Sequence, residues 1–450
     1  MTLPAGQPRS KPPEAEALIG VLPGTELPLG SGSPAWTAPR AGLGPFSRVA
    51  AVFLCGVLAF LDLYATQPLL PLLQRIFHAG KGAVGLTVSA STLGVAISAP
   101  LLGLFAERLS RKRVIVSSIV VLAAPTLLAA TSPNLPIFIA WRLLQGILMP
   151  GIFGVTIAYI TEEWAADSVV LAMSIYVSGT ALGGSLGRIL TGVLTSWLNW
   201  RWAFVLLGIL NLCGSFAVAR LLPREARPSS ARHAGATSLR SFFRPMAAHL
   251  RNPRLIATYF IGFNILFSLV GVFTYVTFYL AAPPFLLSTR ALSYVFVVYL
   301  AGLVATPAAG AILPRIGLRA GLAMANGLSL VGVLATLVPR LPAVAFGLAL
   351  CCTGVFISQA CGTSYVREAT PGGGRVSAVG LYIAFYYVGG TAGGVIPSYL
   401  WHWGGWPGCA VFIAALDLLT IGIALLGWRD IKPSVPAAQP SLSAARVAKL

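Results

Sequence analysis

Apolar runs of about 20 residues recur along the whole chain, the length that a helix needs to span the hydrocarbon core of a lipid bilayer. Only 10% of the 450 residues are charged and 56% are hydrophobic, whereas about a quarter of a soluble protein is charged. The sequence therefore predicts an all-α membrane protein. The expected transmembrane helices are twelve: 48–73, 82–106, 114–131, 136–160, 168–195, 202–222, 255–280, 290–312, 320–338, 342–365, 376–400 and 406–428.

Lys and Arg residues indicate the orientation of these helices, because basic loops stay on the cytoplasmic side of a membrane. With both termini in the cytoplasm, 24 of the 31 basic residues fall in cytoplasmic segments and five in outer loops. The other two, Arg142 and Arg188, lie inside predicted helices. We expect a multi-pass protein of the inner, cytoplasmic membrane, and we attribute the net charge of +19 to this orientation and not to nucleic-acid binding.

The two halves of the chain resemble each other. Trp200 and Trp406 stand half a chain apart in similar surroundings, and so do Glu162 and Glu368. Parallel repeats of this kind are typical of transporters that bind substrate between their halves. We expect two pseudo-symmetric six-helix halves. The predicted segments are a disordered cytoplasmic tail at 1–44, an N-terminal half at 45–222, a cytoplasmic linker at 223–254, a C-terminal half at 255–428 and a cytoplasmic tail at 429–450.

A charged loop separates the second and third predicted helices. It combines a glycine, an acid and a small residue with basic residues, in the order Gly103, Glu107, Arg108, Ser110, Arg111, Lys112 and Arg113. A degenerate copy follows in the second half at residues 310–319. The pattern resembles the signature loop of the major facilitator superfamily of secondary transporters, which usually has Asp at the acid and Gly at the small residue. That resemblance implies the twelve-helix fold and a transport function.

The resemblance also implies a gate at the cytoplasmic face. Glu162 and Glu163 end the fourth predicted helix, so Arg108 and Arg111 can pair with them when the face closes. Gly103 and Glu107 complete the motif. The alternative is that the basic residues only mark the cytoplasmic side. We favour the gate, because the acid and the small residues add nothing to orientation.

The fourth predicted helix carries Arg142 and Gln145 in an Arg-x-x-Gln-Gly pattern. The pattern resembles that of proton-coupled, drug-exporting members of the superfamily. A buried arginine must find an anion, a carbonyl or water. The alternative is an arginine that extends to the outer interface.

Asp62 lies near the middle of the first predicted helix, where an isolated carboxylate is costly and usually functional. Its surroundings can alternate between dry and wet, which suits proton uptake and release. We predict that Asp62, Arg142 and Arg188 couple transport to protons. Alternatively, Asp62 is a fixed partner of one arginine. Arg188 follows glycines four residues apart, Gly179, Gly183 and Gly187, which permit close helix contact.

Several polar or aromatic side chains inside predicted helices are candidates for lining a substrate site, with simple packing as the alternative. They are Tyr64, Gln67, Gln145, Asn264, Tyr275 and Tyr279. Asp417 matches Asn211 of the other half, so we assign Asp417 a helix contact and not transport chemistry.

No nucleotide-binding loop is visible, so energy must come from an ion or substrate gradient. We expect proton-coupled export of a small organic molecule by alternating access. Alternatives are import or uniport of a metabolite such as an organic anion or sugar, and a non-transporting sensor on the same fold. An enzyme ranks last, because paired acids or histidines on one face are not evident. We expect a monomer in the lipid bilayer, without metal, cofactor or nucleic acid.

Overall fold

The computed structural model describes residues 45–106, 110–164, 168–223, 225, 246–370 and 375–428, and these residues are helical apart from turns and short connections. In the first half the elements are α1 Pro45–Leu61, η1 Gln67–Leu69, α2 Leu70–Ile76, α3 Lys81–Ala106, α4 Arg111–Ala130, α5 Leu135–Leu148, α6 Pro150–Glu163, α7 Val169–Trp197 and α8 Trp200–Leu221. In the second half they are α10 Pro253–Ala281, α11 Thr289–Val295, η3 Phe296–Val298, α12 Tyr299–Ile316, α13 Leu318–Ala335, α14 Leu341–Ala369, α15 Arg375–Val395 and α16 Pro397–Gly427.

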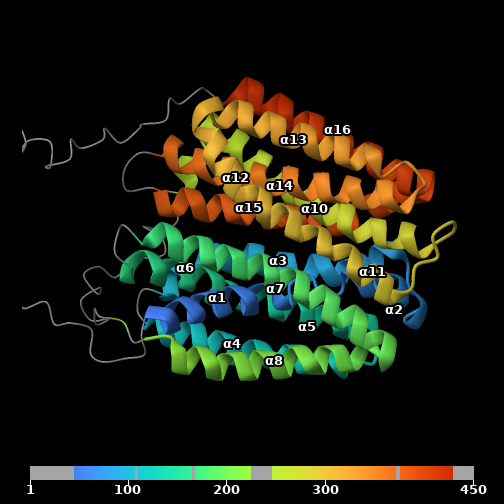
Figure 1. Ribbon diagram of the computed structural model, residues 1–450, viewed down its shortest axis with the longest axis horizontal. Coiled ribbons are helices and arrows are strands. Elements are labelled where there is room, and N and C mark those ends of the chain that lie inside the picture. The colour runs from blue at the N-terminus through green and yellow to red at the C-terminus, as the bar shows by residue number, and fades with distance from the viewer. Residues whose placement is uncertain are drawn as a thin grey trace, which may run out of the picture. The chain divides into compact units, whose positions relative to one another are not determined.

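These elements form the twelve predicted transmembrane segments, arranged as two six-helix halves. Figure 1 shows α1, α4 and α8 together on one side and α13, α14 and α16 together on the other. Within the described ranges, nine helices are long and apolar enough to cross a membrane, and two shorter apolar helices lie at Phe46–Leu61 and Thr289–Gly302. The predicted all-α membrane fold is confirmed.

Asparagine caps begin three of the long helices. The side chains of Asn134, Asn199 and Asn252 accept hydrogen bonds from free main-chain N–H groups in the first turns of α5, α8 and α10. Such a cap satisfies donors that have no partner inside the helix. The local sequence therefore sets where these segments start.

The prediction of one continuous helix over 48–73 is wrong. Helix α1 ends at Leu61, residues 62–66 form turns, and the chain becomes helical again through η1 and α2. Pro68 and Pro71 explain the break, because proline lacks an N–H donor and its ring clashes with the carbonyl four residues earlier. Asp62 and Tyr64 therefore lie in an unwound segment and not on a helical turn.

Three other predicted segments also deviate from straight helices. Met149 separates α5 from α6 just before Pro150, and the 3-10 turn η3 separates α11 from α12. The predicted segment 376–400 is interrupted at Ile396, which separates α15 from α16 just before Pro397. Farther along, Gly404 and Gly405 have non-helical backbone angles inside α16. The φ of +56° at Gly405 favours glycine, because a side chain is strained there. This kink divides the eleventh segment from the twelfth, as the prediction of separate helices requires.

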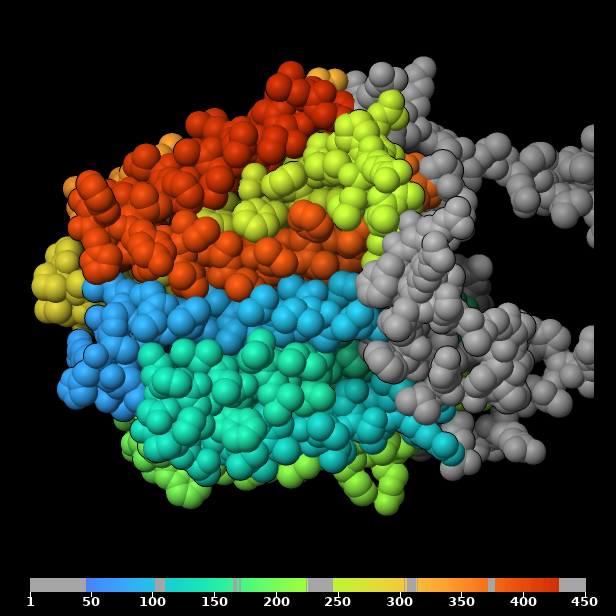
Figure 2. Space-filling view, turned by 180° about the vertical axis from the view of Figure 1, so that it is seen from behind, coloured from blue at the N-terminus to red at the C-terminus, as the bar shows by residue number. Residues whose placement is uncertain are grey.

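The two halves meet along α3 and α15, which lie against each other in Figure 2 (blue and orange). The hydroxyl of Ser89 donates to the Thr391 carbonyl at 2.7 Å, and the hydroxyls of Thr92 and Thr391 are 3.1 Å apart. Small side chains on both helices allow this close, hydrogen-bonded contact.

Candidate functional site

The unwound segment places the carboxylate of Asp62 against two helices of the first half, α4 and α8. Asn211 of α8 donates to Asp62 Oδ2 at 2.7 Å, and Thr126 of α4 lies 3.4 Å from Oδ1. Asp62 is fully buried. Hydrogen-bond donors thus surround a carboxyl group that has left the helical backbone.

Arg142 holds the unwound segment by its main chain. Its guanidinium donates to the carbonyls of Asp62 at 2.9 Å, Leu63 at 2.6 Å and Thr87 at 3.0 Å. It also donates to Gln145 Oε1, and Gln145 Nε2 donates to the Thr126 hydroxyl at 2.9 Å. Arg142 therefore supplies donors to two carbonyls at the break, those of Asp62 and Leu63, and buried carbonyls at a break need such donors.

The structure brings Asp62 and Arg142 together, but not as a fixed ion pair. In the described part of the chain, no ion pair joins the Asp62 carboxylate to an arginine or lysine. Arg142 binds the carbonyl of Asp62 and leaves the carboxylate to Asn211 and Thr126. The alternative of a static carboxylate partner for Arg142 is therefore not what the geometry shows.

Arg188 lies in a second cluster, between the two halves. Its Nε donates to Gln67 Oε1 at 2.7 Å, and Nη2 donates to the hydroxyl of Tyr299 at 3.2 Å. The guanidinium carbon lies 4.7 Å from the ring centre of Tyr64, 4.3 Å from that of Tyr299 and 5.0 Å from that of Phe296. Gln67 also donates to the hydroxyl of Thr274 at 3.3 Å, so both halves contribute to this cluster.

Asp417 has a comparable environment in the second half. The hydroxyl of Ser268 on α10 donates to Asp417 Oδ1 at 2.8 Å, and that of Ser329 on α13 donates to Oδ2 at 2.9 Å. Asp417 is almost completely buried. These bonds join three helices of one half, in agreement with the predicted helix contact.

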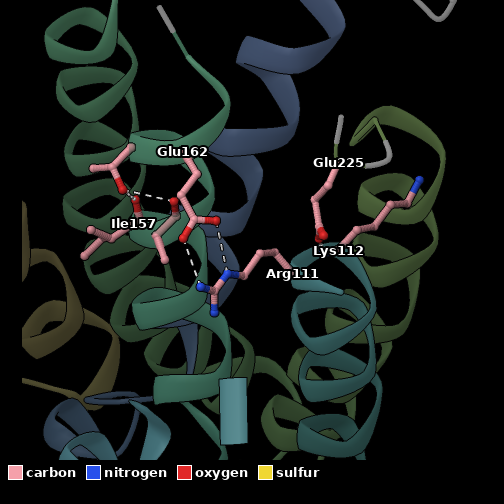
Figure 3. Close-up of polar contacts among 7 residues, drawn as sticks. Arg111, Lys112, Ile157, Glu162 and Glu225 are labelled. Atoms are coloured by element: carbon pink, nitrogen blue, oxygen red, sulfur yellow. Dashed lines mark hydrogen bonds and ion pairs between the residues drawn. The ribbon is translucent and has the colours of Figure 1, made fainter. Parts of the chain in front are cut away.

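At the other end of the bundle, Arg111 and Glu162 form an ion pair. Figure 3 shows their side chains pointing toward each other, with Arg111 Nη2 2.9 Å from Glu162 Oε1 and Nε 3.4 Å from Oε2. Beside them, Glu225 accepts hydrogen bonds from the Ser110 hydroxyl at 3.2 Å and the Lys112 N–H at 2.9 Å. Glu225 thereby caps the start of α4.

Of the other predicted gate residues, the structure describes a contact only for Glu163. The main-chain carbonyl of Glu163 accepts a hydrogen bond from Arg48 at 3.0 Å, and Arg48 lies over the ring of Trp164. Glu107 and Arg108 lie outside the described residues. Gly103 is in α3, but its surroundings are also outside the description.

The other predicted lining residues do not converge on one point. Gln145 belongs to the Arg142 network, and Tyr275 reaches α15. Tyr279 packs on Trp406, with ring centres 5.8 Å apart, and on Phe285 near the end of α10. Asn264 is buried on the same helix. Tyr64 and Gln67 lie beside Arg188.

Sequence reasoning missed the partners of Asp62, namely Asn211 and Thr126, and the contribution of Tyr299 to the Arg188 cluster. The repeat contained a signal for the first. Asp62 and Asn211 are 149 residues apart, and so are Ser268 and Asp417. Aligning the halves on Asn211 and Asp417 therefore aligns Asp62 with Ser268.

Comparisons with known proteins agree with this fold. A transporter of Bacillus subtilis, the uncharacterized MFS-type transporter YybF, is 30% identical over 388 residues, 85% of this chain and 95% of its own. The inner membrane transport protein YnfM of Escherichia coli is 30% identical over 386 residues, covering 85% and 91%. The solved structure of the nucleoside transporter NupG superposes with a TM-score of 0.70 at 14% identity, over 85% of this chain and all of that one.

The sequence model of the Major Facilitator Superfamily matches residues 52–358. This range includes the unwound segment, the Arg142 network and the pair of Arg111 with Glu162. The match, the two relatives and the architecture agree. The chain is a multi-pass membrane transporter that belongs to the Major Facilitator Superfamily.

Proposed function

We propose that the chain is a proton-coupled exporter of a small organic molecule that works by alternating access. The observation that carries the proposal is the buried carboxyl of Asp62 in an unwound part of a membrane segment, without an ionic partner in the described residues. Ionisable groups inside a membrane are rare and usually lie on ion or substrate pathways.

Proton coupling is assigned to Asp62. Asn211 and Thr126 are neutral donors, so the carboxyl is not fixed as an anion by a permanent ion pair. When one side of the transporter opens, water reaches the group and it releases its proton. When the site closes and dries, it takes up a proton. One proton would then be exchanged in each transport cycle.

Arg142 is assigned a positioning role in this cycle. It joins the unwound segment to α3 through carbonyl groups on both, so it transmits movement between the first two membrane segments. Helix interruptions supported in this way are common at transporter binding sites. A movement that frees the guanidinium would also bring a positive charge toward the ionised Asp62.

Arg111 and Glu162 are assigned to the gate. Their pair joins the start of α4 to the end of α6, within the first half. The gate is proposed to hold the orientation of these two helix ends in one state and to release it in the other. Glu163 and the motif residues Gly103, Glu107 and Arg108 remain part of this proposal.

We further propose that both termini and the linker 223–254 face the cytoplasm, and that a monomer acts in the inner membrane. The support is the uneven distribution of basic residues along the chain. Reporter fusions after residues 44, 236 and 440 test this topology. An externally active reporter at any of these positions would overturn it.

The coupling experiment uses purified protein in proteoliposomes and a panel of drugs, organic acids and sugars. A proton antiporter accumulates substrate when the lumen is more acidic than the outside. A symporter does so with the opposite gradient, and a uniporter responds to neither. We expect accumulation with an acidic lumen, together with proton release that requires substrate.

The matched variants are Asp62→Asn and Asp417→Asn, which remove the two buried carboxyls from similar sites. Asp62→Asn should abolish gradient-driven accumulation and spare downhill exchange, whereas Asp417→Asn should retain coupling. Unchanged proton flux per substrate in Asp62→Asn would overturn the assignment and leave Asp62 as a structural residue. A sensor would show no substrate movement in any arm.

A further inference from the structure

The Arg188 cluster is a buried cation without an acidic partner in the described residues. We propose that Arg188, with Tyr64 and Tyr299, binds the anionic group of a small organic anion that has a flat apolar body. This inference rests on the proposed transport function and adds the substrate class. Three observations support it: the hydrogen-bond partners of Arg188 are neutral, aromatic rings surround its guanidinium, and it lies between the two halves.

Among the described residues, no hydrogen-bond partner of Arg188 neutralises its charge. Its partners are the amide of Gln67, the carbonyl of Gly184 at 2.7 Å and the hydroxyl of Tyr299, all of them neutral. Arg188 is only 1% exposed. An unpaired charge at such a site is costly, so an anion that enters it gains a strong electrostatic interaction.

The guanidinium also retains hydrogen-bonding capacity. An arginine carries five N–H donors, and the described contacts of Arg188 engage three of them. The remaining donors are on the two terminal nitrogens. Carboxylate and sulfonate groups suit such donors, because their oxygens match the planar fork of arginine.

Aromatic rings define the rest of the proposed subsite. Tyr64, Phe296 and Tyr299 have their ring centres 4.3–5.0 Å from the guanidinium carbon. These rings offer flat apolar surfaces beside the cation, which favours an aromatic or planar anion over a small inorganic one.

The position of the cluster suits a transported ligand. Arg188 and Tyr64 come from the first half, whereas Phe296 and Tyr299 come from the second. A ligand bound to Arg188 therefore lies where the halves must separate and meet again during alternating access. If Arg188 only held the two halves together, its bond to Tyr299 would hinder this separation. A bound ligand can replace Tyr299 as the partner of Arg188.

The test measures binding at equilibrium, without any gradient. Full-length protein in lipid nanodiscs is titrated by calorimetry with benzenesulfonate, benzenesulfonamide and benzyltrimethylammonium. These probes share a benzene ring and are anionic, neutral and cationic. We expect benzenesulfonate to bind and the cationic probe not to bind. Equal binding of the cation, or no benzenesulfonate binding at millimolar concentration, would overturn the proposal.

Arg188→Gln should weaken benzenesulfonate binding by about tenfold or more, the size of losing one hydrogen bond to a charged group. The matched control is Arg201→Gln, because Arg201 also lies over an aromatic ring, Trp200, but binds carbonyls within the first half. Affinity retained in Arg188→Gln, with a melting temperature like that of Arg201→Gln, would show a structural role only. Arg188→Lys should recover part of the binding.

The binding assay separates this inference from the proposed function. If anion binding follows Arg188 but transport is not driven by a proton gradient, coupling fails and the subsite stands. If proton-driven transport is found only for neutral or cationic molecules, the subsite fails and coupling stands.

Discussion

Asp62 and Asp417 occupy opposite ends of one repeated helix contact. In the first half the acid is on the first membrane segment and accepts a hydrogen bond from Asn211 on the sixth, at 2.7 Å. In the second half the acid is on the last segment and accepts from Ser268 on the seventh, at 2.8 Å. Both pairs are separated by 149 residues. Both halves therefore contain the same contact. The carboxyl is on the first segment of one half and on the last segment of the other.

The different positions of the two carboxyls predict that a carboxyl on either helix of the contact can support coupling. The double variant Asp62→Asn with Asn211→Asp returns a carboxyl to the same contact from the neighbouring helix. We expect it to recover part of the proton-driven accumulation that Asp62→Asn loses, because water and Arg142 still approach the pair. Accumulation is measured in proteoliposomes with an acidic lumen. If the double variant is as inactive as Asp62→Asn, the exact position of the carboxyl is essential and the prediction is wrong.

The length and apolar character of the membrane segments could be predicted because the bilayer permits few alternatives. The sequence also contained a signal for the break after Leu61, because Pro68 and Pro71 both lack a main-chain N–H donor. The prediction nevertheless gave a straight helix, because apolar composition alone does not distinguish a continuous helix from an interrupted one. The structure shows that side chains from other helices satisfy the freed carbonyls.

The glycines before Arg188 permit close contact between α7 and α1, as predicted. A Cβ atom on Gly187 would collide with the main-chain carbonyl of Leu61. Gly187→Ala should therefore lower stability by about 1–3 kcal/mol, the usual cost of overpacking, and lower the melting temperature. The control is Gly327→Ala on α13, where nothing lies within 4 Å of an added Cβ. Equal melting temperatures for the two variants would contradict the close contact.

The pair of Arg111 and Glu162 can be tested by exchanging its charges. Arg111→Glu places two acids together and should slow transport severalfold, whereas Arg111→Glu combined with Glu162→Arg should restore much of the rate. The pair is partly exposed, so we expect little change in protein abundance. Transport rates in proteoliposomes are the measurement. Wild-type transport in Arg111→Glu would leave the basic residues with a role in orientation only.

The candidate site was only partly accessible to sequence reasoning. Asp62, Arg142 and Arg188 stood out because charges are rare inside apolar helices. Their partners did not, since Gln67, Asn211 and Tyr299 come from separate segments and meet only through helix packing. The sequence therefore indicated the charged residues, whereas the division into two clusters, one around each arginine, required the structure.

Arg142 supplies the sharpest test of the unwound segment. Its fork reaches the carbonyls of Asp62, Leu63 and Thr87, and the single ammonium of lysine cannot match that geometry. Arg142→Lys keeps the charge but should leave at least one buried carbonyl without a donor, which costs about 1–3 kcal/mol. We expect a lower melting temperature and at least about tenfold slower transport. Arg201→Lys is the control, because Arg201 also binds two carbonyls, those of Ala130 and Ser132, near a helix end. If both lysine variants transport at the wild-type rate, Arg142 acts only through its charge, and the unwound segment does not depend on the shape of its side chain.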